Sequence, residues 1–259
     1  MPSGFERGLQ IIELLVGQRD GLPLHEIADS LGMPRSAAHR LLSELSDSGY
    51  VHQRDTSGNY ALGLKITSLG LKHLAANDLA GVAKPIVDDL ATVSHELVRL
   101  SVVDGDELVW VAKAQGARSE LRYDPDAGST VKLSCSATGL AWMSFIPEEE
   151  ALTRILRQGI GSVEDYGPRA PQTVDKIREI MRQTRERGFA IAIDTFAVGV
   201  GSIAAPVYDG GAVAGVLSIS GPTARLSEEA YLDLGTPLIE SARRLTSVFA
   251  HSAGSLEVR

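Results

Sequence analysis

The chain is poor in several residue types and patterns, and each scarcity excludes a class of structure. Its single cysteine, Cys135, allows neither a disulfide within the chain nor a cysteine-based zinc site. No apolar run is long enough to cross a bilayer. Residues 1–6 lack the basic start and apolar stretch of a secretion signal. We therefore expect no membrane contact and take the cytoplasm as the default location.

A basic excess is also missing. The net charge is −8, from 25 Lys or Arg residues and 33 Asp or Glu residues. Residues 1–77 carry −1 of this charge, and the remainder carries −7. General attraction to nucleic-acid phosphates should therefore be modest, and any DNA contact must depend on a few local cations and on two copies acting together.

Residues that could form a catalytic, cofactor or metal site are sparse. Residues 199–204 match a dinucleotide-binding glycine pattern, but they run into an apolar strand and Pro206 instead of opening a helix. The histidines stand neither at metal-ligand spacing nor in an evident nucleophile–base arrangement with Cys135. The sequence therefore predicts no cofactor, no metal and no catalytic residue.

Residues 24–49 have the pattern of a helix-turn-helix, since apolar residues recur at helical spacing on both sides of Gly32. Gly32 suits the end of the first helix, and Pro34 suits the start of the second. An ordinary helical hairpin with a solvated face is the structural alternative. In the helix-turn-helix interpretation, the second helix presents donors to the major groove. These are Arg35, Ser36, His39, Arg40 and Ser43.

The flanking segments favour a winged form of this motif. Residues 5–16 predict a third amphipathic helix, and residues 50–53 and 59–64 predict two short strands around a polar turn. Residues 1–63 then form a winged helix-turn-helix that binds double-stranded DNA. The wing would carry Arg54 to the sugar-phosphate backbone or the minor groove.

The remainder predicts a linker helix over residues 64–78, a second domain over 79–252 and a tail over 253–259. Strands and helices mix in this second domain, which indicates an α+β fold with a mostly antiparallel sheet. The predicted helices cover residues 82–95, 136–145, 147–157, 173–187 and a last one from Ser227 to near His251, which Pro237 would kink. The predicted strands cover residues 97–103, 108–113, 121–123, 189–193, 200–207 and 213–220.

The whole chain resembles an IclR-type bacterial transcriptional regulator. Besides the helix-turn-helix, the resemblance depends on motifs that follow one another in the family's order: Tyr60-Ala-Leu-Gly63, Ser136-Ala-Thr-Gly139, Gly188-Phe-Ala-Ile191, Ile203-Ala-Ala-Pro-Val207 and Leu217-Ser-Ile-Ser-Gly-Pro222. It implies a winged helix followed by a GAF-like effector-binding domain. It also implies a homodimer or a dimer of dimers on a palindromic operator, more often a repressor, controlled by a small organic acid or aromatic metabolite.

The resemblance also implies where an effector would bind. The expected residues come from three places, namely Leu121 and Tyr123; Ser134, Ala137, Thr138 and Gly139; and the strand residues Asp194, Ser202, Ser218 and Ser220. From the residues themselves, Ser218 and Ser220 share one face of a strand, so they line a polar pocket or bond to neighbouring backbone. Ser136 opens a helix, where it either serves as an N-cap or helps to bind a carboxylate.

The sequence departs from the family pattern in ways that make the pocket more apolar. Ala192 replaces an aspartate that lines the pocket in some members, and Ser202 replaces a cysteine. Tyr123 and either Trp110 or Trp142 would lie nearby. We therefore expect an effector larger or more apolar than glyoxylate or pyruvate, such as an aromatic acid.

Two other functions compete with a ligand-responsive transcription factor. One is a metabolic enzyme with a winged helix as an interaction module, and the other is a structural DNA-binding protein without a ligand. An enzyme would need a nucleophile–base or metal constellation in residues 79–250, and none is evident in the sequence. The operator, the regulated genes, the effector and the choice between repression and activation stay open.

Overall fold

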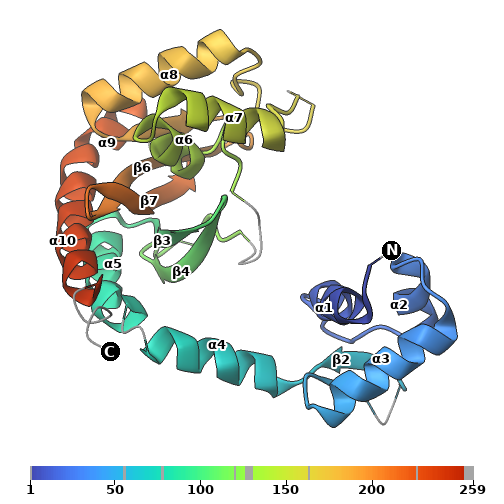
Figure 1. Cartoon of the computed structure of the whole chain (residues 1–259). Helices are drawn as coiled ribbons and strands as arrows, with labels where there is room; N and C mark the ends of the chain where they lie inside the picture. Colours follow the sequence, from blue (N-terminus) through green and yellow to red (C-terminus); the bar gives the residue numbers. More distant parts are fainter. Residues whose placement is uncertain are drawn as a thin grey trace. The chain divides into compact units, whose positions relative to one another are not determined.

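The computed structural model describes residues 2–54, 57–76, 79–119, 121–125, 131–162, 164–225 and 227–253 (Figure 1). Three expectations fall partly outside these residues: the wing turn at 55–56, the domain boundary at 77–78 and the tail from 254. The chain divides into two compact units, Met1–Ala76 and Asn77–Arg259. Within the described residues, none of the helices has the length and apolar character needed to span a membrane.

The first unit is a winged helix-turn-helix. Its core comes from the apolar faces of the first three helices, with Ile11, Ile27 and Leu42 fully buried. Gly32 has a φ of +57°, so the turn between the second and third helices uses the conformational freedom of glycine. The elements are α1 (Gly4–Leu15), α2 (Leu24–Ser30), α3 (Arg35–Asp47), β1 (Val51–Gln53), β2 (Tyr60–Leu62) and α4 (Leu64–Ala76). Strands β1 and β2 pair antiparallel, which confirms the predicted wing.

The second unit is built on a five-stranded sheet in the order β4-β3-β7-β6-β5, and all the pairings between these strands are antiparallel. The predicted α+β class is therefore confirmed. The strands are β3 (Leu97–Asp104), β4 (Glu107–Gln115), β5 (Ala190–Ile193), β6 (Val200–Asp209) and β7 (Ala212–Pro222). The helices are α5 (Leu79–Ser94), α6 (Ala137–Ser144), α7 (Glu148–Gln158), α8 (Val174–Arg187), α9 (Glu228–Asp233) and α10 (Gly235–Ala253).

Helices cover both faces of this sheet (Figure 1). Helices α5 and α10 pack on one face, where Leu100, Ile203 and Ile219 belong to a shared core. Helices α6 and α8 pack on the other face, and α7 packs on α6. Alternate residues of a strand point to opposite faces. Side chains at neighbouring positions of β6 and β7 therefore pack against different helix layers, one on each face of the sheet.

Two predicted elements differ from the structure. Residues 121–123 form no strand, because side chains from elsewhere hold this segment in place. The last helix is two helices, α9 and α10, divided at Leu234. A Cβ on Gly235 would lie 2.4 Å from the Phe189 ring, so the break allows α10 to start in close contact with that ring. Pro237 lies in the first turn of α10, where a missing N–H costs no helical hydrogen bond.

Candidate nucleic-acid interface and ligand pocket

The predicted DNA-reading residues share the exposed face of α3. Arg35, Ser36, His39, Arg40 and Ser43 are all exposed, whereas Ala38, Leu41 and Leu42 are buried on the opposite face. Arg40 Nη1 lies 3.3 Å from Glu44 Oε1 one turn later, in an exposed ion pair that a phosphate could displace. This face therefore offers cations and hydroxyls without rearrangement of the core.

Arg54 has partners inside the first unit. One of its terminal nitrogens donates a hydrogen bond to the carbonyl of Arg19, and the other lies 3.6 Å from a carboxylate oxygen of Asp20. These contacts attach the wing to the connection between α1 and α2. The predicted contact of Arg54 with DNA remains a prediction, and it would require the side chain to leave these partners.

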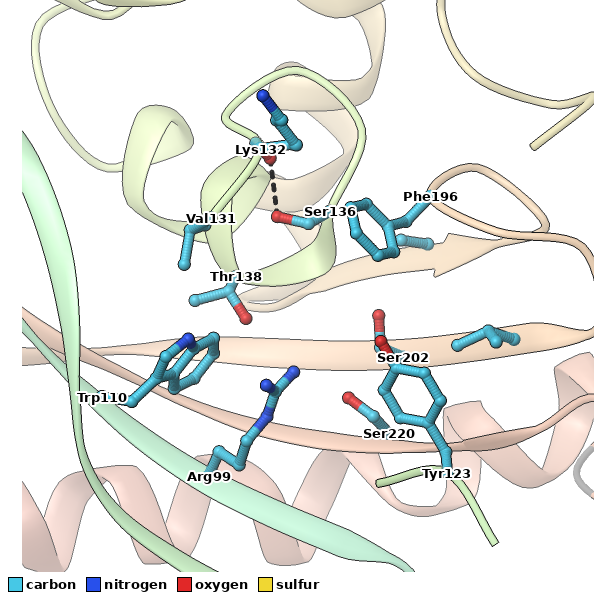
Figure 2. Close-up of a pocket in the computed structure, with 12 residues that line it drawn as sticks. Arg99, Trp110, Tyr123, Val131, Lys132, Ser136, Thr138, Phe196, Ser202 and Ser220 are labelled. Atoms are coloured by element: carbon cyan, nitrogen blue, oxygen red, sulfur yellow. Dashed lines mark hydrogen bonds between the residues drawn. The ribbon is translucent and has the colours of Figure 1, made fainter. Parts of the chain in front are cut away.

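A pocket lies in the second unit between the α6-facing side of the sheet and the segment that enters α6 (Figure 2). It contains about 500 Å³ of empty space, including solvent at its mouth. Its walls combine aromatic and aliphatic side chains with hydroxyls and one inward-pointing guanidinium. The lining residues are Arg99, Trp110, Tyr123, Val131, Lys132, Ser136, Thr138, Ala192, Phe196, Val200, Ser202 and Ser220.

Arg99 provides the positive charge of this pocket. It points into the space between Trp110 and Thr138 on one side and Ser202 and Ser220 on the other (Figure 2). The ammonium group of Lys132 points away from this space (Figure 2). Arg99 Cζ lies 3.9 Å from the centroid of the Trp110 ring. Burial lowers the pKa of Arg99, an effect that Tyr123 partly offsets. Because a guanidinium stays protonated even so, the pocket contains a partly desolvated positive charge.

Among the described residues, the guanidinium of Arg99 forms no salt bridge, and Asp124, which pairs with Lys113, raises its pKa only from a distance. Its Nε is buried without a hydrogen-bond partner there, and so is Nε1 of Trp110. Buried donors are usually satisfied, so two unsatisfied donors that meet at one pocket point to a missing acceptor. A carboxylate fits this position, because its two oxygens match the donors of a guanidinium.

The rest of the lining suits a flat, largely apolar body. Trp110, Tyr123 and Phe196 contribute rings from three different segments, and the hydroxyls of Ser202 and Ser220 face the same space (Figure 2). Ser136 caps α6, since its hydroxyl accepts a hydrogen bond from Gly139 N at 3.0 Å. The capping interpretation of Ser136 is therefore confirmed.

The thiol of Cys135 and the acidic and histidine side chains do not form a reactive or metal-binding group among the described residues. Cys135 is fully buried, and burial raises the pKa of its thiol to about 11, so the thiol is protonated at neutral pH. Within the residues that the structure describes, no group of three or more His, Cys, Asp or Glu side chains could hold a metal ion.

Comparison with known proteins identifies the family. The model for the IclR helix-turn-helix domain matches residues 5–55, and the model for the C-terminal part of the bacterial transcriptional regulator IclR matches residues 71–247. The chain belongs to the IclR family of bacterial transcriptional regulators. It is therefore a DNA-binding regulator, and the family identification decides against the enzyme alternative.

Two curated relatives of this IclR-family protein are repressors by name. The transcriptional repressor AllR of Escherichia coli K12 is 28% identical over 252 residues, which is 97% of this chain and 92% of AllR. The acetate operon repressor of Salmonella typhimurium is 27% identical over 245 residues, which is 94% of this chain and 88% of that protein.

Solved IclR structures share the fold at lower identity. The regulator from Alicyclobacillus acidocaldarius has a TM-score of 0.84 at 21% identity, covering 96% of this chain and 99% of that one. A homologue from Microbacterium hydrocarbonoxydans, crystallised with 4-hydroxybenzoate, has a TM-score of 0.81 at 20% identity, covering 96% of this chain and all of that one.

Four of the predicted effector residues of this IclR-family protein line the pocket, namely Tyr123, Thr138, Ser202 and Ser220. Three others lie beside it with roles in packing. Ser134 donates its hydroxyl to the carbonyl of Ile160 at 2.9 Å. Ala137 and Gly139 are buried in α6, and Gly139 lies against the backbone of Lys132 and Leu133.

The last three predicted residues also lie outside the pocket lining. Leu121 is exposed and its carbonyl accepts a hydrogen bond from Arg225. Asp194 accepts a hydrogen bond from Gly199 N at 2.7 Å and so closes the turn that carries Phe196. Ser218 is buried and donates its hydroxyl to the carbonyl of Arg99, as in the backbone-bonding interpretation.

The sequence-based site omitted Arg99 and Phe196, and it left Trp110 and Trp142 as alternatives. Trp110 lines the pocket, whereas Trp142 is buried in the α6 core with Arg154 over its ring. The available clue to Arg99 was its position as the one charged residue between Leu97 and Val103. An isolated cation in an apolar strand needs a partner, and within the described residues Arg99 has the ring of Trp110 but no salt bridge.

The exposed face of α3 gives a direct test of DNA recognition. Arg40→Ala is expected to weaken operator binding about tenfold at every sequence and to lower the slope of log affinity against log salt by about 1, as for a lost phosphate contact. His39→Ala is expected to change sequence preference, as for a lost base contact. Mobility shifts with operator and scrambled DNA at several salt concentrations measure both effects.

Lys84 serves as the matched control, because it is an exposed cation that pairs with Asp88 one turn later on α5. Lys84→Ala should leave both affinity and salt dependence unchanged. Unchanged operator affinity in Arg40→Ala would remove Arg40 from the interface.

Proposed function

We propose that this protein is a repressor whose binding to a palindromic operator is controlled by an aromatic monocarboxylate bound in the Arg99 pocket. Repression is supported by the names of the two curated relatives, AllR and the acetate operon repressor. An aromatic acid is supported by the Microbacterium homologue, which was crystallised with 4-hydroxybenzoate. Such a regulator would act in the cytoplasm, where its operator lies.

The unpaired guanidinium of Arg99 carries this proposal. A carboxylate placed against it would gain charge-assisted hydrogen bonds and would compensate a charge that the fold has already partly desolvated. The ring of the acid would then contact Trp110, Tyr123 and Phe196. Ser202 and Ser220 would bond to polar substituents of the ring. Pyruvate and glyoxylate could pair with Arg99 but would leave these aromatic side chains without contacts.

Control of DNA binding requires that the acid favours one of two protein states. Two copies on a palindromic operator place their recognition helices at a fixed half-site spacing. Helix α4 follows directly from the wing and precedes the second unit in the chain. The acid would lower operator affinity if it binds more tightly to the arrangement of the paired copies that does not fit the operator. Because coupling is reciprocal, the operator would then weaken acid binding by the same factor.

Calorimetry on the full-length protein tests the ligand class. Benzoate and 4-hydroxybenzoate should bind, benzamide should bind much more weakly because it lacks the charge, and pyruvate and glyoxylate should bind weakly because they lack the ring. Mobility shifts with DNA from upstream of the protein's own gene should show a specific complex that the binding acids dissociate. Binding of the small acids without the aromatic ones would overturn the proposed ligand class. Light scattering of the protein–DNA complex distinguishes a dimer from a dimer of dimers.

A further inference from the structure

Arg225 joins three segments that are distant in sequence. Its Nε and Nη2 donate to the two carboxylate oxygens of Glu96 at 2.6 and 2.9 Å. Its Nη1 donates to the hydroxyl of Ser119 at 2.9 Å and to the carbonyl of Leu121 at 2.8 Å. The guanidinium therefore donates from Nε and Nη2 to a carboxylate and from Nη1 to the segment between β4 and α6.

The carboxylate of Glu96 is a rigid anchor for this contact. Its side chain is 1% exposed, although Glu96 lies outside the sheet, one residue before β3 begins. A Cβ on Gly221 would lie 2.4 Å from the Glu96 carboxylate, so the glycine makes room for the buried acid. A buried carboxylate without a cation is strongly unfavourable, and here Arg225 compensates it. Glu96 in turn holds the guanidinium in one place.

The segment that Arg225 contacts has little packing of its own. We call residues 117–119 and 121–124 the strap; they form neither helix nor strand. Leu121 is 59% exposed, and Arg118, Ser119 and Arg122 are exposed as well. Segments with few buried apolar contacts open at low free-energy cost. The order of the strap must therefore come mainly from its hydrogen bonds.

The strap brings Tyr123 to the pocket. Gln115 donates a hydrogen bond from its amide to the carbonyl of Tyr123 at 3.1 Å, and Lys113 pairs with Asp124 at 3.3 Å. The Tyr123 ring lies beside Ser202 and Ser220, and Tyr123 is close enough to Arg99 to affect its pKa (Figure 2). The position of this pocket wall therefore depends on the strap.

We propose that Arg225 is a positioning residue for effector binding: anchored on Glu96, it fixes the strap so that Tyr123 closes one wall of the pocket. The inference rests on the proposed function, since it assigns a means of retaining the acid at that same site. Arg225 itself does not line the pocket. Its removal should therefore act on the residence time of the acid, and the charge that Arg99 offers should be unchanged.

Arg225→Lys tests the inference in the full-length protein. Lysine keeps a positive charge near Glu96, but one ammonium group cannot serve Glu96, Ser119 and Leu121 together. Loss of the hydrogen bonds that Arg225 donates to Ser119 and to the Leu121 carbonyl should speed trypsin cleavage after Arg118 and Arg122 about tenfold in the ligand-free protein. The Kd for an aromatic acid should rise about tenfold through faster dissociation, while operator affinity without ligand stays unchanged.

Two further variants separate this role from general destabilisation. Arg244→Lys is the matched control, because Arg244 pairs with Asp89 between α10 and α5, away from the lining. It should change neither cleavage nor acid affinity. Ser119→Ala removes the hydrogen bond from Arg225 to Ser119 and the bond that the Ser119 hydroxyl donates to the Leu121 carbonyl. It leaves the bonds from Arg225 to Glu96 and to the Leu121 carbonyl intact, so it should speed cleavage by a smaller factor.

Trypsin cleavage and acid affinity distinguish a failure of the positioning role from a failure of the proposed effector. Cleavage needs no ligand, so faster cleavage in Arg225→Lys together with no acid binding in the wild type would overturn the proposed effector and leave the strap contact supported. Unchanged cleavage, or faster cleavage with unchanged acid affinity, would overturn the positioning role.

Discussion

Arg99→Gln is expected to raise the Kd for an aromatic acid about 100-fold, because a charge-assisted pair of hydrogen bonds to a carboxylate is lost in a partly desolvated site. Operator binding should persist and should no longer respond to the acid. Calorimetry measures the first effect, and mobility shifts with increasing acid measure the second. Arg99→Lys should give an intermediate Kd, since it keeps the charge and loses the planar arrangement of donors.

Arg187 offers a matched control for this substitution. It is also an arginine whose pKa is lowered by burial, with its guanidinium over the ring of Phe189, yet it is not part of the pocket lining. Arg187→Gln should leave acid affinity unchanged. An acid that binds Arg99→Gln as tightly as the wild type would rule out Arg99 as the carboxylate partner.

Gly139→Ala is expected to destabilise the second unit strongly. A Cβ at this position would lie 2.4 Å from the carbonyl oxygen of Lys132 and 2.5 Å from Cα of Leu133. Both are backbone atoms, so no side-chain rotation can relieve the overlap. A cost of about 3 kcal/mol is reasonable for overpacking of this kind, and it should lower the melting temperature by roughly 6–12 °C.

Differential scanning calorimetry checks this expectation on the transition of the second unit. Gly8→Ala is the control, because Gly8 is also helical and an added Cβ would meet nothing within 4 Å. That control should be neutral or slightly stabilising, since alanine favours helices. A melting temperature of Gly139→Ala within about 1 °C of the wild type would contradict the close packing of α6.

The helix-turn-helix can be predicted from sequence because its determinants are local. Apolar spacing, Gly32 and Pro34 together specify two helices and the turn between them, and the structure has α2 and α3 at those residues. The same reasoning predicts α8, where Thr173 caps the start and Gly188 adopts a left-handed conformation at the end.

The effector site is harder to predict because its members meet only through strand register and chain packing. Arg99 and Ser218 are paired across β3 and β7, positions more than a hundred residues apart. The sequence pattern around β7 gives Ser218 and Ser220 the same face of the strand. It does not reveal that Ser218 bonds to backbone while Ser220 lines the pocket. The predicted strand over residues 121–123 is wrong for the same reason, since the carbonyls of Leu121 and Tyr123 accept hydrogen bonds from the side chains of Arg225 and Gln115 and not from a neighbouring strand.

The alternation along β5, β6 and β7 has a consequence for how this regulator can evolve. Ala192, Ser202 and Ser220 line the pocket, whereas their neighbours Ile191, Ile203 and Ile219 pack against the α5 and α10 layer. A substitution at one of the first set alters the pocket lining without a change in the core on the other face. With the proposed effector in this pocket, selection would be able to change effector preference one residue at a time, while the fold that supports the pocket stays constant.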